Sequence, residues 1–299
     1  MTHITEHKRI HLIGIGGCSM SGLASILKNR GYYVQGSDRA ESPFAERLKE
    51  LGVPVFIGHD AKNIGDCDLI IFSAAIKSDN VERAEAKRRG IPELERSEAL
   101  GQLTEGYESV VGIAGCHGKT TITSMLALIC EQGGPDATVH IGGFVDFLNG
   151  GVRLGAHDMF ITEACEYVES FLTLRPTIAL INNIDNDHLD YYGDMEHIVA
   201  AFKKFAALLP ENGLLIGNTA DFRVRALMAE HTGRKLSYGM KDADYTPANI
   251  NYDDNGCPGF DIMFRGEKLM HIQLRIPGEH SVMNAIAAAA VAHGTCEVI

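Results

Sequence analysis

The 299-residue chain has little positive charge. It carries 27 Lys and Arg against 39 Asp and Glu, which gives a formal net charge of -12. Proteins that attract nucleic acid by general electrostatics present a basic surface, so this composition argues against a nucleic-acid partner. An acidic chain that binds polyphosphates must do so with local hydrogen-bond donors, helix N-termini and metal ions.

Paired cysteines, long apolar runs and a leader-like start are also missing. The seven cysteines are scattered and form no CxxC pair, a pattern typical of reduced thiols in the cytosol. The opening MTHITEHKRI is polar and lacks the apolar core of a signal peptide. No apolar run approaches the roughly 20 residues of a membrane span. We therefore expect a cytoplasmic protein that has no membrane partner.

The sequence does contain a regular alternation of apolar strands and helical segments, which predicts an α/β fold. Strands expected at 9–15, 32–38 and 67–75 indicate an N-terminal Rossmann-like domain with a doubly wound parallel sheet. The periodicity fades near residue 105, and we place the boundary between domains 1–105 and 106–299 there.

The second domain is expected to be a P-loop-type α/β ATPase domain. Alternating apolar residues around DDNGCPG predict a small antiparallel appendage over 245–276, and a Pro-Gly entry predicts a helix over 277–294. Further elements of this domain are a helix near 195–209 and strands at 138–141, 158–163, 177–182 and 213–218.

A first glycine-rich turn, GIGGCSMSG over residues 14–22, follows the first expected strand and opens a helix. Asp38 ends the next strand, where dinucleotide-binding folds place the acid that binds the ribose. The third glycine of that fingerprint is replaced by Ser19. The turn favours a nucleotide or nucleotide-sugar site but does not distinguish NAD from UDP, and a turn that serves packing alone is the alternative.

A second glycine-rich turn, Gly115-Cys-His-Gly-Lys-Thr-Thr121, lies between a β-branched run and a helical pattern. Lys119 is placed to reach the β- and γ-phosphates of ATP, and Thr120 to offer a hydroxyl to Mg2+. Only two residues separate its glycines, against four in the usual phosphate loop. The alternative is a strand-to-helix turn with an exposed lysine.

Acidic residues and a histidine follow two later strands of the same domain. Glu163 and Glu166 lie at or just past the end of one strand, and Asp187, His188 and Asp190 lie past the next. Ligand sites of open α/β sheets lie beyond the carboxyl ends of the strands. These side chains are therefore candidates to hold the metal ion that bridges phosphates.

Together these motifs resemble those of the Mur ligase family, the ATP-dependent amino-acid-adding enzymes of peptidoglycan synthesis. AGCHGKTT resembles the family's A-G-T-H-G-K-T-T loop, EACEYVESFL and NNIDNDHLDYY resemble its next two motifs, and PGEHSVMNAIAAAA resembles its last helix. The opening HLIGIGGCSMSGLA is most similar to the alanine-adding branch. The resemblance covers nearly the whole chain.

The resemblance implies site residues in both domains. Catalytic roles fall on Lys119, Glu163 and His188, and the Mg2+ ligands are Thr120, Glu163 and His188. The implied UDP-sugar site contains Gly14, Gly16, Gly17, Ser19, Met20, Ser21, Asp38, Ser73, Ala74, Ala75 and Ile76. The implied ATP site contains Gly115, Cys116, His117, Gly118, Lys119, Thr120, Thr121, Asn183, His280 and Asn284.

The implied reaction joins L-alanine to the lactyl carboxylate of UDP-N-acetylmuramate. ATP first converts that carboxylate to an acyl phosphate, and the amine then displaces phosphate, so no nucleophilic cysteine is required. Alternatives are a ligase that recycles murein peptides onto the same nucleotide sugar, a non-catalytic protein that binds UDP-sugars or ATP, and an NAD-dependent oxidoreductase. The last leaves Lys119 and the acids at the strand ends without a role.

Three substitutions and the chain length depart from the family pattern. Ser19 replaces a glycine, Cys116 replaces Thr or Ser, and Ser281 replaces Asn beside His280. Family members also have a third, C-terminal domain that closes over ATP, whereas this sequence stops just past the helix that precedes it. We therefore expect this chain alone to bind UDP-N-acetylmuramate, to bind Mg-ATP weakly and to turn over little.

Overall fold

The computed structural model describes residues 2–156 and 158–296, with the side chain of Cys296 outside the description. The chain divides into two compact units, which are described separately. Unit 1 comprises Met1–Gly106 and Thr138–Ala156, and unit 2 comprises Tyr107–Ala137 and His157–Ile299. Segment 138–156 thus packs with unit 1, whereas the sequence expectation placed all of 106–299 in the second domain.

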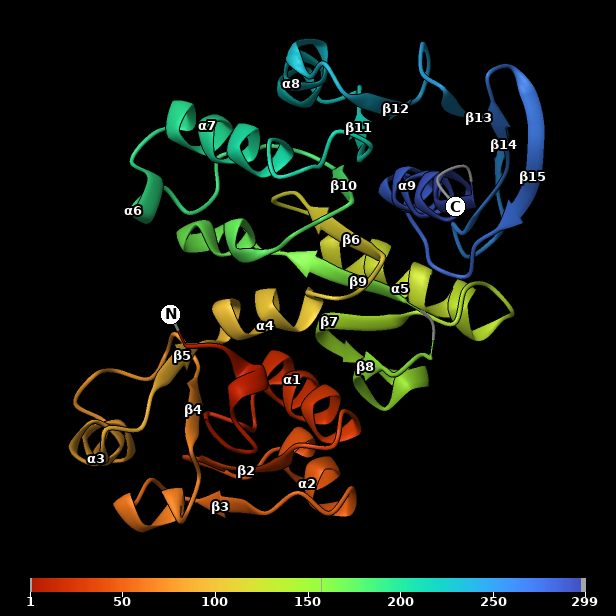
Figure 1. The fold of residues 1–299 in the computed structure, drawn as a ribbon. Coiled ribbons are helices and arrows are strands. Elements are labelled where there is room, and N and C mark those ends of the chain that lie inside the picture. Colours follow the sequence, from red (N-terminus) through yellow and green to blue (C-terminus); the bar gives the residue numbers. More distant parts are fainter. Residues whose placement is uncertain (1, 157, 297–299) are drawn as a thin grey trace. The chain divides into compact units, whose positions relative to one another are not determined.

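Unit 1 is built on a parallel sheet with strand order β3-β2-β1-β4-β5 (Figure 1). This order reverses direction between β1 and β4, the place where doubly wound folds bind ligands. The Rossmann-like prediction is confirmed. The strands are β1 (Arg9–Ile13), β2 (Tyr33–Asp38), β3 (Val55–Ile57), β4 (Leu69–Phe72) and β5 (Glu93–Glu95), and the helices are α1 (Cys18–Asn29), α2 (Pro43–Glu50), α3 (Val81–Arg89) and α4 (Arg96–Thr104).

The segment 138–156 forms an antiparallel hairpin of β7 (Thr138–Val145) and β8 (Gly150–Arg153) that packs on α1. Two glycines allow the close approach. A Cβ on Gly22 of α1 would lie 2.9 Å from the His140 ring, and one on Gly151 would lie 2.7 Å from Cys18 Sγ. The sequence predicted only a short strand here, because small residues on two distant segments leave no periodic signal.

Unit 2 contains a mixed sheet in which the strands run in the order β15-β14-β13-β12-β11-β10-β6-β9. From β9 through β6, β10, β11 and β12 to β13, neighbouring strands pair in parallel. The pairs β13–β14 and β14–β15 are antiparallel. This confirms the predicted α/β domain with an antiparallel appendage. The strands are β6 (Ser109–Ala114), β9 (Met159–Ala164), β10 (Ile178–Ile181), β11 (Leu214–Asn218), β12 (Arg234–Tyr238), β13 (Tyr245–Tyr252), β14 (Pro258–Phe264) and β15 (Glu267–Gln273).

The helices of unit 2 bury apolar faces against this sheet. Phe171 stacks on Phe205 with ring centroids 4.8 Å apart, and Phe205 in turn lies against Gly112 of β6, where a Cβ would be 3.0 Å from its ring. The helix α9 packs against β10 to β14 (Figure 1). The helical elements are α5 (Lys119–Glu131), the 3-10 segment η4 (Tyr167–Thr173), α6 (Leu189–Tyr192), α7 (Met195–Ala206), α8 (Phe222–Glu230) and α9 (Glu279–Cys296).

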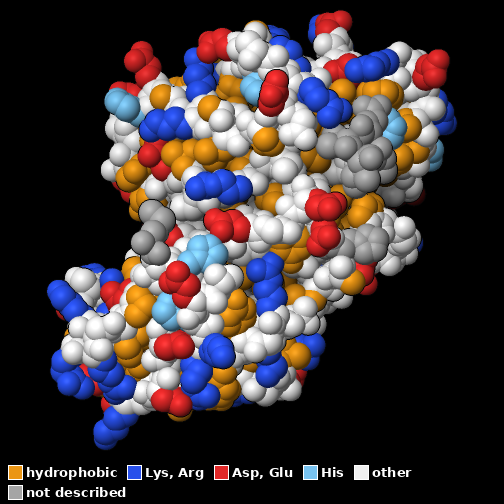
Figure 2. Space-filling view, in the orientation of Figure 1, with side chains coloured by type: hydrophobic (Ala, Val, Ile, Leu, Met, Phe, Trp, Pro, Cys, Tyr) orange, Lys and Arg blue, Asp and Glu red, His pale blue; other side chains and the backbone are white. Residues whose placement is uncertain are grey.

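Acidic and basic side chains are interspersed on the face drawn in Figure 2, in which each unit shows both signs. Among the helices that the structure describes, none combines the length and apolarity needed to cross a membrane.

Candidate functional site

The phosphate-loop candidate occupies the reversal point of the unit 2 sheet. Strand β6 lies between β9 and β10, so the segments that leave the carboxyl ends of these three strands meet at one edge. The loop from β6 enters α5 at Lys119, and Gly118 is the residue before this helix. The helix therefore directs its free N–H groups and positive dipole end toward this edge of the sheet.

Both glycines of the loop are required by its geometry. Gly115 has φ +141° and Gly118 has φ +84°, values that favour glycine. A Cβ on Gly118 would lie 2.6 Å from Asn182 Nδ2 and 2.7 Å from Asn284 Oδ1. The loop thus passes directly beneath a side chain from the end of β10 and one from α9.

Two asparagines after β10 hold the loop by hydrogen bonds to His117. The His117 N–H donates to Asn183 Oδ1 at 2.8 Å, and Asn183 Nδ2 donates to the His117 carbonyl at 3.0 Å. Asn182 Nδ2 donates to the same carbonyl at 2.9 Å. Asn183 was implied as an ATP-site residue; in the structure its amide holds the phosphate loop, and its contact with ATP stays a prediction.

Lys119 forms an ion pair with Glu166. Its Nζ lies 2.8 Å from Oε2 and 3.0 Å from Oε1 of Glu166, and 2.5 Å from the Gly115 carbonyl oxygen. The carboxylate is 1% exposed and the lysine side chain 15% exposed. Of the two acids recognised at the end of β9, Glu166 binds Lys119. Glu163 lies on β9 opposite Ile113, and its role as a metal ligand stays a prediction.

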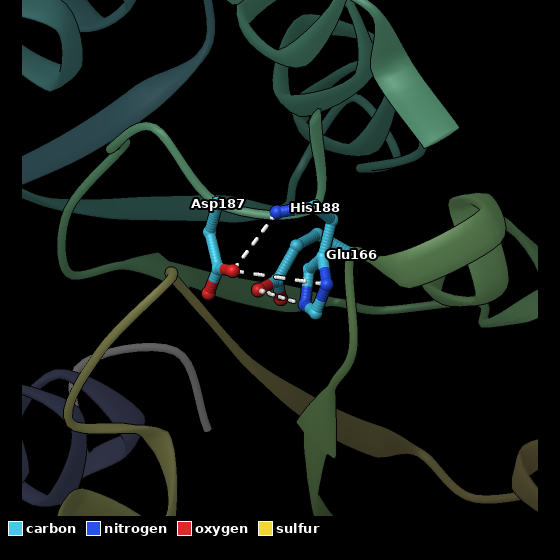
Figure 3. Close-up of side chains that lie close together, drawn as sticks. All are labelled: Glu166, Asp187 and His188. Atoms are coloured by element: carbon cyan, nitrogen blue, oxygen red, sulfur yellow. Dashed lines mark hydrogen bonds and ion pairs between the residues drawn. The ribbon is translucent and has the colours of Figure 1, made fainter. Parts of the chain in front are cut away.

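Glu166, Asp187 and His188 form a cluster of possible metal ligands (Figure 3). One ligand atom from each lies within 4.8 Å of the others. His188 Nε2 is 3.8 Å from Glu166 Oε1, and His188 Nδ1 is 3.7 Å from Asp187 Oδ1. The sequence predicted that acids and His188 would converge at the strand ends, and these three do.

The backbone around this cluster has left-handed conformations. His188, the residue before α6, has φ +56°, and Val168 and Glu169 in η4 have φ +48° and +55°. Such angles are uncommon for residues with a Cβ, above all for β-branched valine, and they concentrate at functional sites. The Tyr192 hydroxyl donates to the Glu166 carbonyl and holds this turn.

Cys116 serves as a packing residue of the loop. Burial raises the pKa of its thiol to about 11, so the thiol is protonated at neutral pH and is a poor nucleophile. Its sulfur accepts the Asp185 N–H at 3.2 Å. For Cys116, this agrees with the expectation that the implied reaction requires no nucleophilic cysteine.

The other implied ATP-site residues surround the same loop. Thr120 is exposed in the first turn of α5, with Thr121 half-buried beside it. At the start of α9, His280 is exposed and Asn284 is buried against Gly118. Ser281 is buried and donates to the Pro277 carbonyl at 2.9 Å, so the residue that departs from the family pattern links the first turn of α9 to the segment before it.

In unit 1 the first glycine turn is closed by Asp38. Its Oδ2 accepts the Gly16 N–H at 2.8 Å, and Ser42 Oγ donates to the Gly16 carbonyl at 2.8 Å. A Cβ on Gly16 would lie 2.9 Å from Asp38 Oδ2. Asp38 was predicted at the ribose position and implied as a UDP-sugar residue; in the structure it orders the turn, and the ligand contact stays a prediction.

The other implied UDP-sugar residues lie beside this turn or in it. The turn Ser73–Ile76 follows β4, and a Cβ on Gly14 would lie 3.3 Å from Ser73 Cβ. Within the turn Ser73–Ile76, Ala74 and Ala75 are exposed. Met20 is 2% exposed, so its side chain packs in the interior. Gly17 precedes α1, and Ser21 Oγ donates to the Cys18 carbonyl.

Two residues near Ser19 were missed by sequence reasoning. Arg96 NH1 donates to Ser19 Oγ at 3.3 Å, and His140 Nε2 lies 3.2 Å from the same oxygen. They belong to α4 and to the hairpin, both distant in sequence from the glycine turn. Burial lowers the pKa of His140 to about 4, so this histidine is neutral at pH 7, and Arg96 supplies the positive charge beside the start of α1.

These two strand-end sites and the sheet that carries each define a Mur ligase: residues 9–108 match the model of the Mur ligase family, catalytic domain, and residues 113–292 match the model of the Mur ligase middle domain. The second match alone spans more than half of the chain. The protein belongs to the Mur ligase family.

Among its relatives are UDP-N-acetylmuramate–L-alanine ligases. That of Alkaliphilus metalliredigens is 45% identical over 294 residues, which is 97% of this chain and 64% of the relative. That of Clostridium beijerinckii is 46% identical over 287 residues, 96% of this chain and 62% of the relative. The chain thus spans somewhat less than two thirds of the length of these relatives.

Solved structures give the same fold. The UDP-N-acetylmuramate–alanine ligase of Thermotoga maritima superposes with a TM-score of 0.84 at 28% identity, over 97% of this chain and 66% of that one. The UDP-N-acetylmuramate:L-alanyl-γ-D-glutamyl-meso-diaminopimelate ligase from Neisseria meningitides also has a TM-score of 0.84 at 28% identity, over 98% of this chain and 97% of that one.

Proposed function

We propose that this chain supplies the nucleotide-sugar-binding and ATP-binding units of a UDP-N-acetylmuramate–L-alanine ligase. The observation that carries the proposal is the convergence of Lys119, Glu166 and His188 at the carboxyl ends of β6, β9 and β10. A phosphate loop joined to a carboxylate–imidazole cluster suits transfer of a phosphoryl group. The alanine-adding relatives cover 95% or more of the chain, which supports this substrate pair.

The cluster has the chemistry to hold Mg2+. Mg2+ prefers carboxylate oxygens and phosphate oxygens, and it is usually bound by one or two carboxylates beside a nucleotide. Glu166 and Asp187 offer such oxygens next to His188. The resemblance adds Thr120 and Glu163 as further ligands. When bound, Mg2+ would neutralise charge on the phosphate oxygens and so stabilise their transfer.

The loop itself binds and orients the triphosphate in this proposal. Backbone N–H groups at the start of α5, which begins at Lys119, face the β- and γ-phosphates, and Lys119 supplies a positive charge there. Asn182 and Asn183 keep the loop in shape through His117. The substrate carboxylate and the γ-phosphate are both anions, so their approach requires this positive charge.

Unit 1 binds the UDP-sugar at the reversal point between β1 and β4. The glycine turn and the start of α1 present N–H groups to the diphosphate. Arg96, bonded to Ser19, adds a cation at the same place. The uridine is assigned to Asp38 and the turn Ser73–Ile76, and the lactyl carboxylate is the group that the ATP of unit 2 activates.

A second candidate is a ligase that adds a whole peptide to the same nucleotide sugar. The Neisseria ligase, whose name gives a tripeptide substrate, has the same TM-score and identity as the alanine ligase from Thermotoga. Both candidates share the two anion sites and the acyl-phosphate chemistry. They differ only in the amine that attacks.

Calorimetry tests the nucleotide-sugar part of the proposal. The chain is titrated with UDP-N-acetylmuramate, UDP and NAD. We expect UDP-N-acetylmuramate to bind best and UDP to bind more weakly; a preference for NAD would remove the ligase assignment. The amine is tested by ADP release with L-alanine or with L-alanyl-γ-D-glutamyl-meso-diaminopimelate. A preference for the peptide would favour the second candidate.

A further inference from the structure

Lys119 turns back into its own loop. Its ammonium has three hydrogens, and its close acceptors are the Gly115 carbonyl and both oxygens of Glu166 at 2.5, 2.8 and 3.0 Å. The Cys116 carbonyl lies at 3.5 Å. These contacts use the donors with which a phosphate-loop lysine binds phosphate, so a triphosphate must displace them.

Glu166 places a negative charge at the same point. Its carboxylate is 1% exposed, so water screens it poorly. In this arrangement the loop presents to an anion a neutralised lysine and not a free cation. Metal-free ATP, which carries several negative charges, should therefore bind weakly to this loop.

The same carboxylate also faces the other two potential ligands of the cluster. Glu166 Oε1 is 3.0 Å from Lys119 Nζ and 3.8 Å from His188 Nε2, and Asp187 completes the group of three. Figure 3 shows the carboxylate of Glu166 beside the imidazole. Glu166 therefore lies between the lysine ammonium and a group of side chains that could hold a divalent ion.

We propose that Glu166 is a positioning residue that holds Lys119 inside the loop until a divalent cation arrives, and so makes triphosphate binding depend on that cation. This inference rests on the proposed function, since it concerns the same phosphate loop. A divalent cation attracts the carboxylate more strongly than an ammonium does, because it carries twice the charge. Lys119 is then released to bind the β- and γ-phosphates.

The turn that carries Glu166 fits such a role. It contains Val168 and Glu169, which have left-handed backbone angles. Two hydrogen bonds hold its backbone: the Tyr192 hydroxyl donates to the Glu166 carbonyl, and the Phe171 N–H donates to the Cys165 carbonyl at 2.9 Å. These bonds fix the position of the Glu166 backbone. Its carboxylate can then change partner by rotating side-chain bonds while the backbone stays in place.

The test measures binding of ATP and of inorganic tripolyphosphate to the 299-residue chain, in EDTA and in Mg2+. Wild-type protein should bind both far better in Mg2+. Glu166→Gln removes the charge and keeps the size of the side chain. We expect it to bind both ligands about tenfold more tightly than wild type in EDTA, and less tightly than wild type in Mg2+.

Glu166→Gln is thus expected to raise affinity in EDTA and to lower it in Mg2+. These opposite changes distinguish a positioning role from structural damage. A variant that only disorders the loop would lose affinity under both conditions, and that result would overturn the inference. Glu166→Asp is the second variant, in case the amide does not fold. Its shorter reach weakens the bond to Lys119, so metal-free binding should again exceed that of wild type.

Glu169→Gln is the matched control. Glu169 lies on the same turn but pairs with exposed Lys204 at 2.7 Å, so its neutralisation should leave metal-free binding within about twofold of wild type. If Glu166→Gln and Glu169→Gln tighten metal-free binding equally, general charge and not the contact with Lys119 is responsible. If wild type binds neither ligand even in Mg2+, the proposed function itself fails.

Discussion

The Tyr238 hydroxyl donates a hydrogen bond of 2.7 Å to Asn182 Oδ1, and both side chains are buried. The Asn182 amide in turn donates to the His117 carbonyl. A residue at the end of β12 therefore supports the phosphate loop through one intermediate. The chain of bonds runs across β11 and β10, so the loop depends on the order of the sheet as well as on its own sequence.

Tyr238→Phe should weaken both the fold and the loop. The change leaves Asn182 Oδ1 buried without its donor, which costs about 1–3 kcal/mol of unfolding free energy, and it should lower Mg-ATP affinity. Tyr245→Phe is the control, because that buried tyrosine bonds His293 at 2.8 Å instead. Urea unfolding followed by circular dichroism, with ATP titrations, checks both. Equal loss of ATP affinity in the two variants would contradict the role of Tyr238.

Gly118→Ala should abolish binding of nucleotide to unit 2. A methyl group there lies within 2.7 Å of Asn182 and Asn284, and the backbone angle is left-handed. Gly133→Ala is the matched control, since Gly133 also has a left-handed φ, of +103°, but nothing within 4 Å of a new Cβ. It should cost about 1 kcal/mol of stability and leave binding intact. Wild-type ATP affinity in Gly118→Ala would show that the contacts are unimportant.

Lys119→Ala should remove ATP binding and leave UDP-N-acetylmuramate binding unchanged, because the two sites lie in different units. It also leaves the Glu166 carboxylate buried without its cation, which should cost about 3 kcal/mol of unfolding free energy. Calorimetry with each ligand and urea unfolding test these outcomes. A parallel loss of UDP-sugar binding would indicate general unfolding and contradict the assignment.

His140 should make the protein less stable in mild acid. Burial lowers its pKa from 6.5 to about 4, so between these values the unfolded chain binds a proton that the folded chain does not. Stability from this group is present above pH 6.5 and is lost as pH falls toward 4, by about 3 kcal/mol in all. His140→Gln should reduce the fall in unfolding free energy between pH 6.5 and 4, as measured by urea unfolding at several pH values. An unchanged dependence of this free energy on pH would show that His140 does not cause it.

Much of the fold follows from local sequence. The β-branched runs before Gly14 and Gly115, the glycines with left-handed angles, and a lysine at a helix start all act through their neighbours in the chain. For that reason the two sheets, the loop that enters α5 and the antiparallel strands of 245–276 were predictable. The acids after β9 and β10 were predictable as a group, because parallel strands end at a common edge.

Pairings between distant segments were not predictable in this way. The hairpin of 138–156 joins unit 1 because Gly22 and Gly151 allow it to lie on α1. Arg96 and His140 reach Ser19 from distant segments. No local pattern reports such contacts.

Composition and motif spacing were sufficient to assign an acidic α/β chain with two glycine-rich turns and acids at the strand ends, since backbone conformation and side-chain type act over a few residues. That Glu166 binds Lys119 was decided only in three dimensions. Glu163 is still on β9, whereas Glu166 lies beyond it in a turn that the distant Tyr192 holds. A side chain past the end of a strand takes its direction from tertiary contacts, and the strand's own periodicity no longer controls it.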